Sequence, residues 1–238
     1  MKVIHIPQYK KNLVFFEKAG SSLMAGFFKG ILDFKGIEIS SRLLDNNDWG
    51  GDKILFVRNP LERLVSIFYH LNIVKGNDMT VHQKIDALNK FLDGYEENCK
   101  TVNDTHLQSQ SWEYQMAKGD RLIKIEDVRN GYGMITDGYR ASSNMDFNSK
   151  NDFFNETDYI KNFGFIEDIG IPMDDKDRLF AVTLYGFILG KLNAGHHHNE
   201  SELMIDWLKN NNRGDVLSKL IRITKDEMGR FGYTNQLI

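Results

Sequence analysis

The sequence has little cysteine, little proline and no long hydrophobic run. Among its 238 residues there is one cysteine, Cys99, and there are three prolines. A single cysteine excludes a disulfide within the chain and fits a reducing compartment. No apolar run approaches the ~20 residues of a membrane-spanning helix, and the opening MKVIHIPQYKK lacks the apolar core of a signal peptide. We therefore expect a cytoplasmic protein without a membrane span.

Positive charge is not in excess either. The sequence has 30 lysines and arginines and 33 aspartates and glutamates, which gives a formal net charge of −3. This balance argues against a broadly basic surface for nucleic acid, although it leaves room for a local basic pocket. With 41% hydrophobic and 26% charged residues, the composition is that of a globular protein, and the length predicts one domain over residues 1–238.

Short apolar runs alternate with helical patterns along the first half of the chain. The runs typical of strands are Val3–Ile6, Leu13–Phe16, Ile37–Ser40, Lys53–Val57 and Leu122–Ile125. Apolar residues at helical spacing follow the second and fourth runs, at Leu23, Phe27 and Ile31 and at Leu61, Leu64, Val65 and Phe68. Further helices are predicted at Lys176–Leu192, Glu202–Lys209 and Asp215–Arg230. This order predicts an α/β fold with a mainly parallel sheet and helices on both faces.

The first junction with chemical interest is LVFFEKAGSSLMAGFF. Here a strand ends at Phe16, Lys18-Ala19-Gly20 turns the chain, and Ser21-Ser22 begin a helix. Free amides at a helix start, with two hydroxyls and an ammonium beside them, suit a phosphate or sulfate group. The alternative is an ordinary capped helix with a solvated lysine. This is no Walker A loop, because Lys18 precedes the glycine.

The second junction is KILFVRNPLERLVSIFY. Asn59 and Pro60 favour a helix start, and Arg58 ends the strand where ligands of open α/β sheets bind. The Arg58 guanidinium and the Ser66 hydroxyl, two turns into the helix, suit a phosphate monoester. The alternative is an ion pair of Arg58 with Glu62 or Asp52.

These two junctions together resemble the PAPS-dependent sulfotransferases, most closely the membrane-type carbohydrate branch that includes the chondroitin and uronyl sulfotransferases. Three later segments are similar to motifs of that branch in the same order: THLQSQ (105–110) to its His-x-x-x-Gln, GHHHNES (195–201) to its His-x-Asn-x-Ser, and DEMGRFGY (226–233) to its closing signature. The resemblance implies a P-loop-like sulfotransferase fold. The family's Golgi anchor and paired cysteines are missing, so we expect a soluble bacterial or viral form.

The resemblance also implies roles for residues. Lys18, Ala19, Gly20, Ser21 and Ser22 would hold the 5′-phosphosulfate of the co-substrate PAPS, and Lys18 would also be catalytic. Arg58 and Ser66 would hold the 3′-phosphate, which remains on the product PAP. His106 would be the general base, with Glu126, Glu167 and Asp104 as the next candidates. The family's acidic element matches Ile125-Glu126-Asp127 and Ile166-Glu167-Asp168 equally well.

The histidine run His196-His197-His198, with His106 as a fourth ligand, is the one candidate for a metal site. Adjacent residues rarely present three converging imidazoles, so we expect no metal. Residues 129–157, rich in Asn, Ser, Gly and Asp, predict a long surface loop on the acceptor side.

The predicted activity is transfer of a sulfuryl group from PAPS to a hydroxyl of a carbohydrate, a glycolipid or a small metabolite. The mild negative charge argues against a heparin-like acceptor. One alternative is a P-loop-type nucleotide-dependent kinase, which would need a Gly-Lys-Ser/Thr loop that the sequence lacks. Another is a non-catalytic PAP-binding module, against which the presence of Lys18 and His106 argues.

Overall fold

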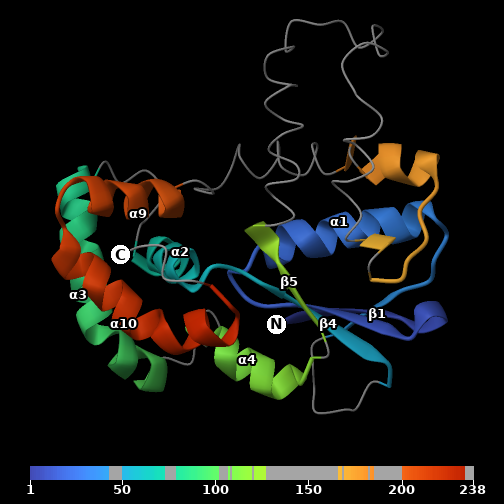
Figure 1. Ribbon diagram of the computed structural model, residues 1–238, viewed down its shortest axis with the longest axis horizontal. Coiled ribbons are helices and arrows are strands. Elements are labelled where there is room, and N and C mark those ends of the chain that lie inside the picture. Colours follow the sequence, from blue (N-terminus) through green and yellow to red (C-terminus); the bar gives the residue numbers. More distant parts are fainter. Residues whose placement is uncertain are drawn as a thin grey trace, which may run out of the picture.

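A five-stranded sheet forms the centre of the computed structural model (Figure 1). The structure describes residues 1–42, 50–72, 79–101, 107, 109–119, 121–126, 166–167, 169–181, 183–184 and 200–233. The strands are β1 (Lys2–Ile6), β2 (Lys11–Phe15), β3 (Ser40–Arg42), β4 (Asp52–Val57) and β5 (Arg121–Lys124), in the spatial order β3-β1-β2-β4-β5. The expected strands are all present, with Ile37–Ser40 shifted to Ser40–Arg42. The predicted loop at residues 129–157 lies outside the described residues.

The sheet is mixed, because β1 runs opposite to its neighbours. β1 pairs antiparallel with β2 and with β3, whereas β2, β4 and β5 pair in parallel. Between β1 and β2 lie only the short 3-10 helix η1 (Pro7–Tyr9) and Lys10. A parallel crossover needs a dozen or more residues. The short connection between β1 and β2 therefore makes a hairpin. The prediction of parallel pairing is confirmed for β2, β4 and β5, whereas β3, at the edge of the sheet, pairs with the antiparallel β1.

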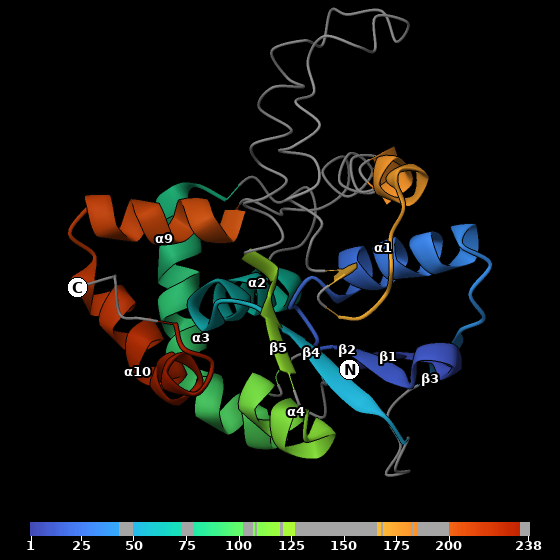
Figure 2. The same cartoon turned by 45° about the vertical axis from the view of Figure 1, so that its right-hand side comes forward.

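Helices cover both faces of the sheet, as the alternating pattern predicts. Helix α1 (Ser21–Phe34) and helix α4 (Gln110–Ala117) lie on opposite sides in both views (Figures 1 and 2). Phe15 and Phe56, paired across β2 and β4, face α1 and contact Phe28 with ring centroids 6.1 and 5.3 Å apart. Successive strand residues point to opposite faces, which directs Val14 and Leu55 to the α4 side.

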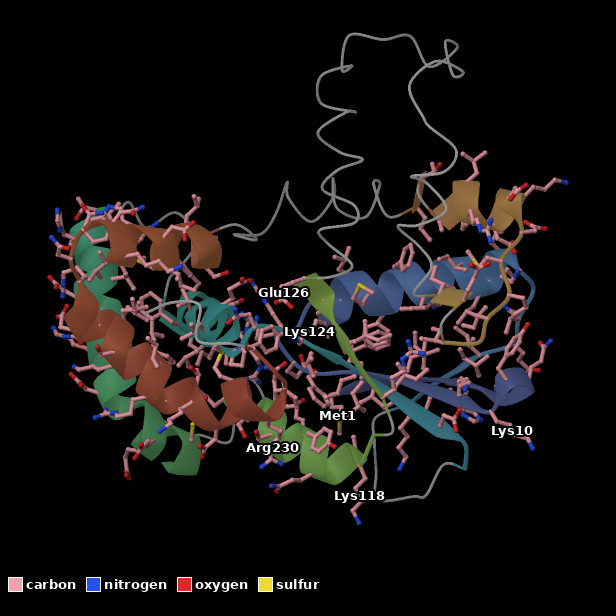
Figure 3. All side chains as sticks on the ribbon, viewed as in Figure 1. Met1, Lys10, Lys118, Lys124, Glu126 and Arg230 are labelled. Carbon is pink, nitrogen blue, oxygen red and sulfur yellow. The ribbon has the colours of Figure 1, made fainter. Side chains whose placement is uncertain are left out.

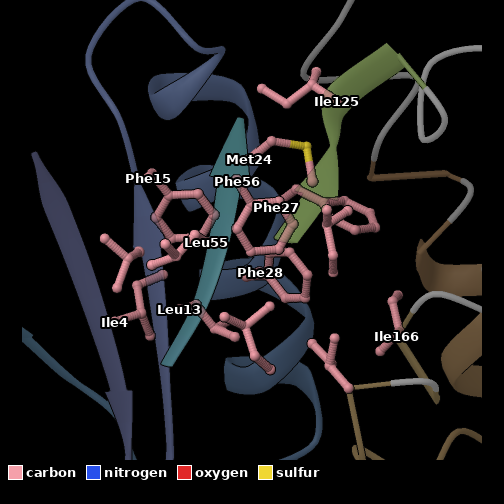
Figure 4. Close-up of a cluster of buried hydrophobic side chains, with 14 of the residues drawn as sticks. Ile4, Leu13, Phe15, Met24, Phe27, Phe28, Leu55, Phe56, Ile125 and Ile166 are labelled. Atoms are coloured by element: carbon pink, nitrogen blue, oxygen red, sulfur yellow. The ribbon is translucent and has the colours of Figure 1, made fainter. Parts of the chain in front are cut away.

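The core of this layer is unusually aromatic (Figure 4). Phe15 and Phe56 stack with their ring centroids 4.8 Å apart, and both are fully buried. Met24 and Phe27 from α1 close the same cluster, and Ile125 packs over it from the end of β5. Burial of such side chains stabilises the fold by about 1.5–3 kcal/mol each, which fixes α1 against the strand ends.

A second core lies among helices beside the sheet. It joins α2 (Pro60–Asn72), α3 (Val81–Thr101), α9 (Glu200–Asn210) and α10 (Gly214–Arg230). Residues 175–181 and 183–184 are also helical. The predictions from the sequence include α2, α9 and α10 but neither α3 nor α4. The apolar residues of α3, Ile85, Leu88, Leu92 and Tyr95, follow the helical spacing and are buried, so the pattern was present within a mostly polar segment. Within the described residues no helix is long and apolar enough to cross a membrane.

Candidate functional site

The loops that follow β2, β4 and β5 meet at one edge of the sheet. In the parallel register Phe15 lies opposite Phe56, and Val57 lies opposite Lys124. The three strands therefore end at the same level, where open α/β sheets bind ligands. The β2–α1 loop, Glu17–Gly20, and the β4–α2 loop, Arg58–Asn59, are direct neighbours. The two junctions that the sequence analysis singled out are thus brought together.

The β2–α1 loop makes a tight turn with two residues in the left-handed region. Lys18 has φ +58° and Gly20 has φ +68°, and the Ala19 amide donates a hydrogen bond to the Phe16 carbonyl. Ala19 is buried, whereas Lys18 is only half-buried. Among the described residues no side chain caps α1. The first-turn amides of an α-helix have no partners within the helix, so this uncapped start can bind an anion.

Both serines of the first helical turn lie at this site. Ser21 is buried, and Ser22 is exposed. Ser22 Oγ accepts a hydrogen bond from Lys2 Nζ at 3.2 Å. Lys2 reaches the loop because the hairpin places it opposite Phe15, at the end of β2. A second ammonium beside the helix start adds to its positive potential.

Arg58 lies in the second loop and is buried, with 6% of its surface exposed. Its Nε and Nη2 donate to Glu62 Oε2 at 3.3 and 3.1 Å, and Nη2 also donates to Ser201 Oγ at 2.9 Å. The ion pair with Glu62 that the spacing suggested is therefore present, whereas Asp52 pairs with Lys11 at the other end of the sheet. Within the part of the chain that the structure describes, Arg58 Nη1 donates no hydrogen bond.

Gln110, the last residue of the THLQSQ segment, forms two hydrogen bonds with the backbone of Arg58. The Arg58 amide donates to Gln110 Oε1, and Gln110 Nε2 donates to the Arg58 carbonyl, both at 2.9 Å. Gln110 is fully buried at the first residue of α4. These contacts join three motifs far apart in sequence, because Ser201 belongs to the GHHHNES segment.

Glu126 completes the network at the end of β5. Its Oε1 accepts the Asn59 amide at 2.7 Å, and its Oε2 accepts the Tyr233 hydroxyl at 2.8 Å. Glu167 instead accepts from Arg178 Nη2 at 2.5 Å, away from these loops. Of the two acidic elements that the sequence left open, the one with Glu126 lies at the site. The closing DEMGRFGY segment reaches it through Tyr233.

A buried ion pair between Arg63 and Glu113 connects the β2–α1 loop with helices α2 and α4. Arg63, on α2, donates from Nε to the Glu17 carbonyl at 2.9 Å, and Glu113, on α4, accepts the Glu17 amide at 3.3 Å. Arg63 is 2% exposed and Glu113 is 0% exposed, and Arg63 Nη2 lies 3.9 Å from Glu113 Oε2. Burial raises the pKa of Glu113 to about 7, against the opposing effect of the Arg63 charge.

The remaining predicted residues are less completely described. Ser66 lies half-buried on α2, one turn beyond Glu62 and on the same side of the helix. His106 and the run His196-His197-His198 lie outside the described residues. Among the residues that are described, no group of three or more His, Cys, Asp or Glu side chains could hold a metal ion.

Residues 45–162 match the family model described as the sulfotransferase family. This match supports membership of the sulfotransferase family. It includes Arg58, Ser66, His106 and Gln110 and spans just under half of the chain, while the β2–α1 loop and the two late segments lie outside it. No curated protein and no solved structure matches the chain. The match supports sulfuryl transfer in general as the activity. Ser201 and Tyr233 lie beyond the matched residues, but they contact Arg58 and Glu126, so the site extends past the match.

Sequence reasoning missed several residues of this site. Lys2 could have been found from the short Pro7–Lys10 connection, which forces a hairpin. Arg63 and Glu113 gave no signal, because a charged residue in an amphipathic helix is usually solvated. Their buried positions depend on how α2 and α4 pack beneath the β2–α1 loop.

Proposed function

We propose that the chain is a PAPS-dependent sulfotransferase, which moves a sulfuryl group to a hydroxyl of a carbohydrate or of a related small acceptor. The observation that supports this most is the meeting of the β2–α1 and β4–α2 loops at one edge of the sheet, tied by the bond from Arg63 Nε to the Glu17 carbonyl. Two anion-binding junctions side by side suit a nucleotide with phosphate groups at two positions.

The β2–α1 loop is the proposed site of the 5′-phosphosulfate. The uncapped amides of Ser21 and Ser22, with the Ser22 hydroxyl, would bind non-bridging oxygens. Lys18 would donate to the bridging oxygen, where negative charge develops as the bond to sulfur breaks. Pre-oriented donors of this kind stabilise the charged state without reorganising during the reaction.

The β4–α2 loop is the proposed site of the 3′-phosphate. Arg58 keeps Nη1 without a hydrogen bond to any described residue, and Ser66 lies two turns along α2. Glu62 and Ser201 hold the other nitrogens, so the guanidinium is already oriented before a ligand arrives. A fixed guanidinium beside a hydroxyl suits a phosphate monoester.

His106 is the proposed general base, which would take the proton of the acceptor hydroxyl. An imidazole with an ordinary pKa near ~6.5 suits this role at neutral pH. We propose no metal in the reaction, because the ammonium of Lys18 can stabilise the leaving oxygen. The acceptor is proposed to be neutral or weakly charged, since the chain carries a net charge of −3.

The test is transfer of labelled sulfate from PAPS to a panel of saccharides and small alcohols. We expect Lys18→Ala and His106→Ala each to lower turnover roughly 100-fold without unfolding the chain. Lys10→Ala is the matched control, because Lys10 also has a positive φ, +50°, and is exposed. Lys10 lies at the far end of the sheet from Glu126 (Figure 3), so its variant should keep full activity.

Calorimetry with PAP and with ADP separates the alternatives. PAP should bind more tightly, because ADP lacks the 3′-phosphate that Arg58 would hold. Tighter binding of ADP or ATP would overturn the proposal in favour of a kinase. Binding of PAP without transfer to any acceptor would favour the non-catalytic module.

A further inference from the structure

The backbone of Glu17 is held from two helices at once. Arg63 Nε on α2 donates to its carbonyl at 2.9 Å, and Glu113 Oε1 on α4 accepts from its amide at 3.3 Å. Glu17 is the residue immediately before Lys18 in the β2–α1 loop. Both hydrogen-bonding groups of one peptide residue are therefore satisfied by ionisable side chains from elements far away in sequence.

This arrangement is costly to build and is therefore specific. Arg63 and Glu113 are 2% and 0% exposed, and burial of charged groups is unfavourable unless their partners compensate. Glu113 Oε2 accepts no hydrogen bond among the described residues, although Arg63 Nη2 lies 3.9 Å away. An apolar pair would fill the same space without that cost, but it could not hold a peptide group in place.

What the pair holds is a strained turn. Lys18 has φ +58°, a conformation that costs an L-residue with a Cβ free energy and that persists only where its surroundings impose it. Immediately after Glu17 the chain must turn so that the amides of Ser21 and Ser22 point to the edge of the sheet. Fixing the Glu17 peptide fixes where that turn begins.

We propose that Arg63 and Glu113 are positioning residues, a clamp that holds the β2–α1 loop at a set distance from the β4–α2 loop. Arg63 lies five residues after Arg58, in the first turns of the helix that this second loop begins. The clamp therefore links the proposed 5′ and 3′ anion sites through one rigid helix. This inference rests on the proposed function, because the spacing matters only if one ligand spans both loops.

The clamp and a merely structural ion pair predict different binding. The probes are PAP, adenosine 5′-monophosphate and adenosine 3′-monophosphate, with the two weak ligands measured by competition against PAP. Arg63→Met and Glu113→Met remove the hydrogen bonds to Glu17 but keep side-chain volume. Glu113→Gln keeps an oxygen that can accept the Glu17 amide, and it is the conservative rescue variant.

Thr224→Val is the matched control for lost stability. Thr224 is buried on α10, and its hydroxyl donates to the Leu220 carbonyl at 2.8 Å within that helix. The Thr224→Val variant also loses one buried hydrogen bond, but Thr224 contacts neither the β2–α1 loop nor the β4–α2 loop. Each variant is first shown to be folded by its circular dichroism spectrum, and amide hydrogen exchange is then measured over residues 17–23.

The two methionine variants should bind PAP and the 5′-monophosphate roughly 10-fold more weakly, because the loop is displaced, and the 3′-monophosphate as tightly as the wild type does. Their amides at residues 17–23 should exchange faster, whereas Glu113→Gln and Thr224→Val should match the wild type in both measurements. Equal losses for all three nucleotides, or unchanged exchange, would overturn the clamp. If the wild-type chain itself binds no PAP, the proposed function fails, and the exchange data alone then decide whether the clamp orders the loop.

Discussion

The β2–α1 loop and the β4–α2 loop lie side by side, but their polar groups are engaged in different ways. In the first loop, the donors at the start of α1 belong to the backbone, and no side chain caps the helix among the described residues. In the second loop, Arg58 and Asn59 are bound by Glu62, Gln110, Glu126 and Ser201. One loop is prepared for a ligand by its open amides, the other by a network that is largely complete before any ligand binds.

This difference separates function from stability. Changes at the donors of the first loop should alter binding and turnover more than unfolding, because no side chain caps the amides at the start of α1 among the described residues. Changes in the second loop should do both, since they leave buried polar partners without hydrogen bonds. The comparison can therefore be tested by measuring the free energy of unfolding and the affinity for PAP on the same variants.

The largest effect on stability is expected for Arg58→Met. The substitution removes the ion pair with Glu62 and the hydrogen bond to the buried Ser201, and loss of one member of a largely buried pair costs about 3 kcal/mol. Chemical denaturation should show this loss, and calorimetry should show weaker binding of PAP. Lys18→Ala should weaken binding but lower the unfolding free energy less than Arg58→Met does, because Lys18 is only half-buried.

Arg213→Met is the control for loss of an arginine ion pair. Arg213 pairs with Asp215 through two nitrogens, at 3.0 and 3.1 Å, but this pair is exposed to solvent. Exposed ion pairs contribute little, so the control should unfold almost as the wild type does. Equal stability of Arg58→Met and Arg213→Met would show that the second loop is no more tightly held than the surface.

The two loops also differ in how much of them could be predicted from the sequence. The strands, α1, α2 and the meeting of both junctions at one edge follow from local apolar patterns and from the rule for parallel strands. The hydrogen bonds of Arg58 to Gln110 and Ser201 do not, because no local pattern states which distant side chain meets a strand end. Motif order suggested that these segments belong to one site, but only the packing of α4 against β4 and of α9 against α2 brings them together.

Glu113 offers an intermediate effect that depends on pH. Because burial raises its pKa from 4.5 to about 7, the folded chain retains a proton that the unfolded chain releases between these values. The contribution of Glu113 to the free energy of unfolding is therefore fully present below pH 4.5 and is lost as the pH rises to 7. The loss is about 2 kcal/mol between pH 5 and 7.

Glu113→Gln removes this titration, so its stability should fall less than that of the wild type over the same range. Denaturation midpoints of both proteins, measured at half-unit steps of pH, give the difference directly, and titrating groups that do not interact with Glu113 cancel in it. Parallel pH profiles for the two proteins would mean that Glu113 titrates normally and that its burial is relieved in solution.

The smallest effect, and the sharpest comparison within the first loop, is expected for Gly20→Ala. Gly20 has φ +68°, and a Cβ built there would lie 3.0 Å from Ile125 Cδ1, at the end of β5. Gly36, at the end of α1, has φ +65° with nothing within 4 Å of such a Cβ. Gly36→Ala should therefore lower the free energy of unfolding by about 1 kcal/mol, through the left-handed backbone preference alone, and Gly20→Ala by slightly more.

Only Gly20→Ala should also weaken PAP binding, because Ile125 must move or the loop must shift at the start of α1. Equal affinity for PAP in both variants would mean that the first loop tolerates displacement, and that its amides are not the anion-binding groups.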